Sequence, residues 1–217
     1  MSRTVEQKAG GGESRSRRMV IIIGIVAVIA IAAVAALSTG GTSETTTPGV
    51  VVSETQPVTV SGAALPRYPE QGPDPAIGQQ APEVSGLSFD GTPVSIANDG
   101  NAKIIIFLAH WCPHCQNDVK ELTPYIEANG LPAGVEFYSV ATGSDPAAPN
   151  YPPSEWLKDW PIMTMADSSQ GEAAQAFGLN AFPFFVFVTA EGNVDFRFPG
   201  EVPPETLVEA ARTLAGS

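Results

Sequence analysis

Two cysteines, Cys112 and Cys115, have the spacing best suited to chemistry, and the chain has no others. They follow directly on an apolar run from Ile104 to Ala109, which predicts a buried strand. A helical pattern then extends to about Asn129. Unpaired backbone N–H groups and the positive end of the dipole favour a thiolate at a helix start. We therefore expect a reactive Cys112, with Cys115 one turn away and able to form a disulfide with it.

Disulfide exchange needs an attacking thiolate, a second thiol that resolves the mixed disulfide, and access for the partner. We assign attack to Cys112, on the exposed side of the predicted helix start, and resolution to Cys115, shielded further in. Pro113 fits the first helical turn. His114 can stabilise the Cys112 thiolate by charge or hydrogen bond, which makes the disulfide a stronger oxidant.

The run from Trp111 to Cys115 resembles the Trp-Cys-x-x-Cys site of the thioredoxin superfamily, and its Pro-His dipeptide is similar to that of DsbA-type oxidants. A second match, Phe177 to Val188, resembles the thioredoxin segment that carries a cis-proline into a central strand. The resemblance implies that Pro183 is this cis-proline and that its loop lies against the cysteines. It covers roughly residues 81–217.

The predicted fold class is α/β, because strands alternate with helices that cover both faces of a sheet. The resemblance implies a thioredoxin-like fold with a central mixed sheet. An N-terminal β-hairpin is predicted around Asp90-Gly91, similar to the TlpA-like branch of membrane-anchored extracytoplasmic thioredoxins. Residues 142–161 are rich in proline and predict an irregular insertion. The other predicted elements are strands from Val135 to Ala141, Phe184 to Val188 and Val194 to Phe198, and helices from Glu172 to Phe177 and Pro203 to Leu214.

The chain departs from the family pattern at one position. Thioredoxin and DsbA place a buried acid six residues before the first cysteine, where this chain has Ile106. Asp118, three residues after Cys115, matches the place where ResA-like proteins carry an acid, and the alternative is a solvated helix residue. Trp111 either supports the site or simply packs beside it.

Other uses of the cysteines fit the sequence less well. A zinc site needs two further ligands, and the only histidines, His110 and His114, are poorly placed. A c-type haem site needs histidine where Gln116 stands. A peroxiredoxin-like thiol peroxidase resembles the layout, but Ala109 replaces the Thr or Ser of its motif and Ile105 its Pro. A non-catalytic binding module would not require both cysteines. We predict no cofactor and no metal.

The net charge of −12 is unevenly distributed. Residues 1–18 carry five basic and two acidic groups, and the remaining six basic and 21 acidic residues give −15. An acidic domain argues against nucleic acid as a partner. The predicted partners are extracytoplasmic protein thiols and disulfides, and a membrane or thioredoxin-type redox partner.

Residues 19–37 are apolar throughout, and at a helical rise of about 1.5 Å they span roughly 28 Å, close to a bilayer core. Signal-peptide cores run about 7–15 residues, so a retained anchor is favoured over cleavage after Ala33-Val34-Ala35. The arginines before the span predict a cytoplasmic tail, residues 1–18, and an extracytoplasmic C-terminal domain on a single-pass cell-membrane protein. Residues 38–80, rich in Ser, Thr, Gly and Pro, predict a disordered linker before the domain, residues 81–217.

Together these features predict an extracytoplasmic thiol–disulfide oxidoreductase that exchanges a Cys112–Cys115 disulfide with protein substrates. The Pro-His dipeptide favours an oxidant. A membrane anchor with an N-terminal hairpin is instead typical of reductive members that supply thiols for cytochrome c maturation, which is the alternative.

Overall fold

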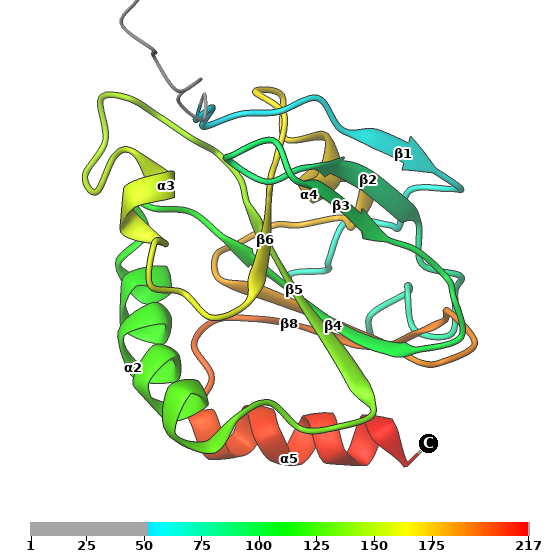
Figure 1. Cartoon of the computed structure of the whole chain (residues 1–217). Helices are drawn as coiled ribbons and strands as arrows, with labels where there is room; N and C mark the ends of the chain where they lie inside the picture. Colours follow the sequence, from blue (N-terminus) through cyan, green and yellow to red (C-terminus); the bar gives the residue numbers. More distant parts are fainter. Residues whose placement is uncertain (1–51, 217) are drawn as a thin grey trace, which may run out of the picture. The chain divides into compact units, whose positions relative to one another are not determined.

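A five-stranded sheet forms the centre of the computed structural model, which describes residues 52–216 (Figure 1). Its strand order is β6-β5-β4-β7-β8. The central strand β4 runs parallel to β5 and antiparallel to β7. The strands are β4 (Ala102–Leu108), β5 (Val135–Ala141), β6 (Met163–Ala166), β7 (Phe184–Val188) and β8 (Val194–Pro199).

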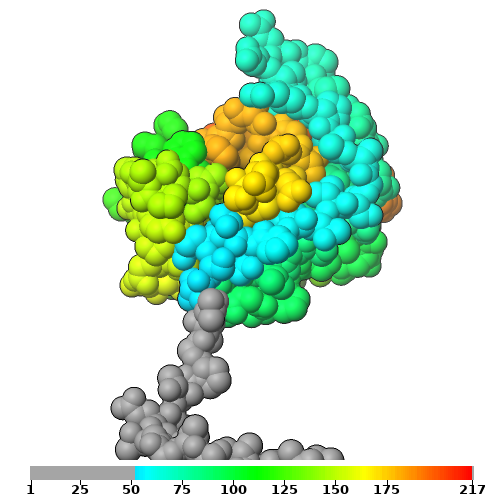
Figure 2. Space-filling model, turned by 90° about the horizontal axis from the view of Figure 1, so that it is seen from above, coloured from blue at the N-terminus to red at the C-terminus, as the bar shows by residue number. Residues whose placement is uncertain are grey.

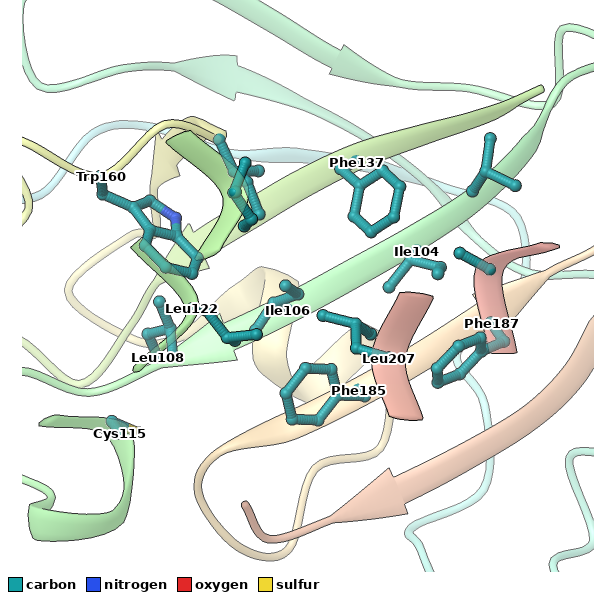
Figure 3. Packing of buried hydrophobic residues seen from close by; sticks show 14 of the residues in the cluster. Ile104, Ile106, Leu108, Cys115, Leu122, Phe137, Trp160, Phe185, Phe187 and Leu207 are labelled. Atoms are coloured by element: carbon teal, nitrogen blue, oxygen red, sulfur yellow. The ribbon is translucent and has the colours of Figure 1, made fainter. Parts of the chain in front are cut away.

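All seven residues of β4 are buried, because both faces of the sheet are covered. Ile104 and Ile106 point to a face covered by α2 (Pro113–Asn129) and α5 (Pro204–Ala215), where they pack with Leu122 (Figure 3). Ile105 and Phe107 belong to a second cluster on the opposite face. That face is covered by α4 (Glu172–Ala176) and by an antiparallel sheet of β1 (Thr59–Ser61), β2 (Glu83–Leu87) and β3 (Pro93–Ile96). The predicted α/β, thioredoxin-like fold is confirmed.

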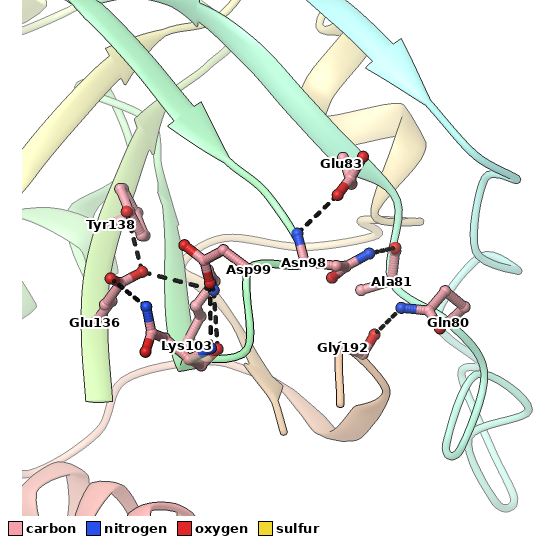
Figure 4. Close-up of polar contacts among 10 residues, drawn as sticks. Gln80, Ala81, Glu83, Asn98, Asp99, Lys103, Glu136, Tyr138 and Gly192 are labelled. Carbon is pink, nitrogen blue, oxygen red and sulfur yellow. Dashed lines mark hydrogen bonds and ion pairs between the residues drawn. The ribbon is translucent and has the colours of Figure 1, made fainter. Parts of the chain in front are cut away.

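The start of β4 also carries a buried cation, Lys103, whose side chain is 2% exposed. Its Nζ pairs with Asp99, donates to the Asn101 carbonyl at 2.8 Å and lies 3.5 Å from Glu136 Oε2 (Figure 4). The hydrogen bond from Lys103 lowers the pKa of Asp99. These partners compensate the desolvation of the ammonium group, so the one charged residue of β4 fits the interior.

The prediction of a disordered linker up to Gln80 is wrong for residues 52–80, and residues 38–51 lie outside the described part. The strand β1 pairs with β2, and Leu65 and Ala76 are buried against the domain. The predicted Asp90-Gly91 hairpin turn is confirmed between β2 and β3. The composition of residues 52–80 gave no sign of order because their partners lie far away in the sequence.

One of these long-range contacts is a buried ion pair between Asp74 and Arg197 of β8. The Arg197 side chain is fully buried, and its Nε donates to Asp74 Oδ2 at 2.8 Å. Its Nη1 donates to the carbonyls of Pro66 and Phe177 at 3.0 and 2.8 Å. Burial opposes ionisation of Asp74, yet hydrogen bonds from Arg197 and from the Ala76 N–H lower its pKa below the ordinary value. This buried ion pair holds residues 52–80, the N-terminal segment of the described chain, on the folded domain.

The region predicted as an irregular insertion is partly regular. It contains α3 (Pro153–Trp156), and β6 follows it in a stretch where we predicted no strand. Trp160 is 8% exposed and packs in the core, where its Nε1 donates to Ser139 Oγ at 3.0 Å. A strand of four residues leaves too little periodicity to be found in the sequence.

No helix within residues 52–216 is long and apolar enough to cross a membrane. The predicted membrane span, residues 19–37, and the predicted tail, residues 1–18, lie outside the described residues.

Candidate active site

The site lies where β4 ends and α2 begins. Cys112 is the N-cap residue of α2, and Pro113 occupies the first helical turn as predicted. The N–H of Cys112 donates to the Ala109 carbonyl at 3.0 Å, and the Gln116 N–H donates to the Cys112 carbonyl at 3.1 Å. Cys112 is 6% exposed and Cys115 is completely buried. We predicted that Cys112 lies on the exposed side of the helix start, but most of its surface is buried. Cys112 is nevertheless the more accessible of the two free thiols.

The surroundings of Cys115 favour a protonated thiol. Burial raises the pKa of Cys115 far above its ordinary value, and the neighbouring Cys112 and Asp118 raise it further. Only the Ala109 N–H opposes this, donating to Cys115 Sγ at 3.4 Å. The two cysteines thus have different environments. Cys115, to which we assigned resolution, is enclosed and favours the protonated thiol.

Asp118 lies on the same helix, one turn beyond Cys115, and is 2% exposed. Its Oδ1 accepts the Val202 N–H at 3.2 Å, whereas its Oδ2 is buried without a partner among the described residues. Burial raises the pKa of Asp118 to about 7, and the charges of Glu201 and Glu121 add to this. The alternative of a solvated helix residue is wrong. A carboxyl group that titrates near neutral pH can take up or release a proton there.

His114 does not contact Cys112 by any hydrogen bond in the described part of the chain. It is largely exposed, and its Nδ1 pairs with the Glu201 carboxylate. The Asn117 side chain donates to the same carboxylate oxygen at 3.3 Å. Hydrogen bonds from His114 and Asn117 lower the pKa of Glu201. The stabilisation of Cys112 that we predicted for His114 is therefore limited to charge, and Glu201 offsets part of it.

Phe182, the residue before the cis-proline, contacts both Cys112 and Trp111. The Phe182–Pro183 bond is cis, as the resemblance implied, and Cys112 Sγ lies 3.6 Å from the Phe182 carbonyl oxygen. The Trp111 ring meets the Phe182 ring edge-on at 5.6 Å. Trp111 Nε1 donates to the Gly143 carbonyl at 2.8 Å, and 37% of the residue remains exposed. Trp111 thus packs against the cis-proline loop and leaves part of its side chain exposed.

Two residues near the site were not found from the sequence. Glu201 had no local signal, because its contact with His114 joins positions 87 residues apart. His110 is 1% exposed and holds the loop that follows β5. Its Nδ1 contacts the Pro149 carbonyl oxygen at 2.6 Å, and its Nε2 accepts the Asp145 N–H at 3.1 Å. Within residues 52–216 no three Cys, His, Asp or Glu side chains gather as they would around a metal ion.

The family model named Redoxin matches residues 76–214. The chain belongs to the Redoxin family. A search of curated protein sequences gave no significant match. The chain is similar in structure to a thiol:disulfide interchange protein from Chlorobium tepidum TLS, with TM-score 0.53 and 23% identity over 64% of this chain and 97% of that one. It is also similar to StoA from Bacillus subtilis, with TM-score 0.51 and 19% identity over 62% and 98% of the two chains. These likenesses show the fold.

The raised pKa of Asp118 predicts a specific dependence of stability on pH. The unfolded carboxyl ionises near 3.8 and the folded one near 7, so ionisation costs stability as the pH rises through this window. The wild type should lose roughly 2–3 kcal/mol of unfolding free energy from this group between pH 5 and pH 8. Asp118→Asn removes the charge and should remove this loss.

Urea unfolding of the full chain at pH 5 and pH 8 measures this loss of unfolding free energy. Glu127→Gln is the control, because Glu127 is an exposed acid on the same helix. Glu127→Gln should lose as much unfolding free energy between pH 5 and pH 8 as the wild type. If Asp118→Asn also loses as much as the wild type, the loss does not come from the Asp118 carboxyl.

Proposed function

We propose that this chain is an extracytoplasmic thiol–disulfide oxidoreductase in which Cys112 attacks and Cys115 resolves. The observation that carries the proposal is the asymmetry of the pair. Cys112 caps α2 and keeps some accessibility, whereas Cys115 is fully enclosed and its pKa is raised. Membership of the Redoxin family supports redox chemistry at this pair. The partners are protein thiols and disulfides and a membrane or thioredoxin-type redox protein.

In the oxidising direction the Cys112–Cys115 disulfide accepts two electrons. A client thiolate attacks Cys112 Sγ, the client–Cys112 bond forms, and Cys115 leaves as a thiolate and takes up a proton. A second client thiolate then attacks the client sulfur, so the client disulfide forms and Cys112 leaves as a thiolate. Asp118, with a pKa of about 7 and a place one turn from Cys115, supplies that proton at neutral pH. The same steps in reverse reduce a client disulfide.

The roles of the two cysteines predict opposite behaviour of their single variants. Cys112→Ser should abolish exchange, because no thiol remains that a client can reach. Cys115→Ser should accumulate clients as mixed disulfides on Cys112, because nothing resolves them. Non-reducing electrophoresis and mass spectrometry of the adducts measure this, and the double variant is the control for adducts formed elsewhere. Trapping by Cys112→Ser instead would reverse the roles.

We propose oxidation as the direction in the cell. The helix start and the charge of His114 both favour the reduced pair, which makes the disulfide the stronger oxidant. A reductase is the second candidate, and a specific contact favours it. Glu201 binds His114, and a carboxylate there offsets the positive charge that an oxidant needs. The contact between His114 and Glu201 therefore contributes to the proposed direction of exchange.

Two variants test this contribution in equilibrium with glutathione. His114→Ala should lower the potential by about 30 mV, which corresponds to about 1.4 kcal/mol for a two-electron couple. Glu201→Gln should raise it, because the charge on His114 is no longer offset. Glu205→Gln, an exposed acid at the start of α5, is the control. A wild-type potential near that of thioredoxin, about −270 mV, with no response to either variant, would favour the reductase.

We propose that residues 19–37 anchor the protein in the membrane with the folded domain outside, on the strength of the length of the apolar run and the preceding arginines. The chain should remain in the pellet after alkaline carbonate extraction of membranes and keep its original N-terminus on sequencing. A soluble chain that starts near Ala36 would mean that the segment is a cleaved signal peptide.

A further inference from the structure

A groove of about 260 Å³ lies beside the redox site. It is lined by Arg67 of the N-terminal segment, by Gln175 of α4, and by Asn180, Ala181 and Phe182, which lead into Pro183. Figure 2 shows the N-terminal segment, in cyan to teal, against the gold-to-orange surface of α4 and the residues that follow it. The groove thus joins a segment outside the predicted domain to the loop that contacts Cys112.

Phe182 connects the groove to the chemistry. It lines the groove, and its carbonyl oxygen lies 3.6 Å from Cys112 Sγ. The residue whose carbonyl contacts the Cys112 sulfur is thus also part of the wall of the groove, and the groove begins next to the place where a client cysteine would bond. A strand residue advances the chain by about 3.3 Å, so a side chain one or two positions from the client cysteine is within reach of the groove.

Arg67 gives the groove its charge. It is exposed, and it is the one charged residue among those that line the groove in the described part of the chain. Residues 52–216 hold six basic and 20 acidic residues. Four of these cations have an anionic partner within 4 Å, namely Lys103, Lys158, Arg197 and Arg212. Of the described cations, only Arg67 and Lys120 have no such partner, and Arg67 is the one beside the redox site.

The backbone around Arg67 is fixed on both sides. The Pro66 carbonyl accepts a hydrogen bond from Arg197 at 3.0 Å, and the Tyr68 N–H donates to the Gly178 carbonyl at 2.8 Å. The Asn180 amide donates to the Tyr68 carbonyl at 3.0 Å. Because these bonds hold the segment in place, binding at Arg67 orders only its own side chain. Among the described residues the Arg67 guanidinium has no anionic partner, and such a group is suited to paired hydrogen bonds with a carboxylate.

We infer that this groove, the Arg67 groove, receives an Asp or Glu side chain that lies one or two residues from the reacting cysteine of a client. The inference rests on the proposed exchange at Cys112 and names the class of client. Arg67 then selects clients by charge on a domain that otherwise repels acidic proteins.

Three dicysteine peptides test the inference, identical except for Glu, Gln or Lys at the second position on either side of the cysteine that reacts first. The full chain in a neutral detergent, with its cysteines oxidised, is mixed with each reduced peptide. The wild type should oxidise the Glu peptide about threefold to fivefold faster than the Lys peptide, as for one exposed ion pair. Arg67→Glu should reverse the ratio, and added salt should bring both ratios toward one.

Lys120→Gln is the matched control, because within residues 52–216 Lys120 is the other cation without an anionic partner, it lies outside the groove, and its loss should keep the wild-type ratio. If every peptide reacts, but the Glu-to-Lys ratio is the same in the wild type and in Arg67→Glu, the groove assignment is wrong and the exchange activity stands. If no peptide is oxidised, the proposed function fails, and the client class fails with it.

Discussion

The redox site depends on the backbone of one residue, Ala109, at the end of the central strand. Its carbonyl accepts the N–H of Cys112, and its N–H donates to the sulfur of Cys115. Because β4 is buried on both faces, this backbone has little freedom to move. Ala109 therefore holds the backbone of Cys112 and the sulfur of Cys115, and Cys112 Sγ is contacted separately by the Phe182 carbonyl.

The family resemblance implied a buried acid at residue 106 of the central strand, but the buried carboxyl group near the cysteines is Asp118 on α2. Ile106 fills the usual position within β4 and packs in the core, so the interior of the sheet stays apolar. Asp118 approaches from α2, and burial is the main cause of its raised pKa. Two residues after β8 modify that pKa, because the N–H of Val202 lowers it and the charge of Glu201 raises it. Since Glu201 also binds His114, one short segment contacts both the proposed proton carrier, Asp118, and the histidine of the Cys-Pro-His-Cys motif. The proposed proton transfer and the proposed redox direction are thus coupled through Glu201.

The features that could be predicted from the sequence are those encoded locally. The apolar run of β4, the placement of Pro113 at the helix start and the turn at Gly91 each follow from a few adjacent residues, and Pro183 followed from a family motif. Asp118 is buried where it meets the backbone of Val202, far away in the chain, so helical spacing alone left a solvated residue open. The order of residues 52–80 could not be predicted for the same reason, since composition does not register distant partners.

The N-terminal segment reaches the redox site because the chain leaves room for it at one glycine. Gly178 has φ +69°, and a Cβ there would lie 2.3 Å from the Pro66 carbonyl oxygen, too close for any side chain. The close approach lets the buried Asp74–Arg197 pair and the Pro66 hydrogen bond form together. A buried ion pair adds little net stability, but removing one partner leaves the other charge buried and uncompensated, which is costly. The pair therefore specifies where the N-terminal segment lies. Arg67, next to Pro66, is held beside Phe182 as a consequence, and the charge that selects a client is fixed by the same contacts that fold the segment.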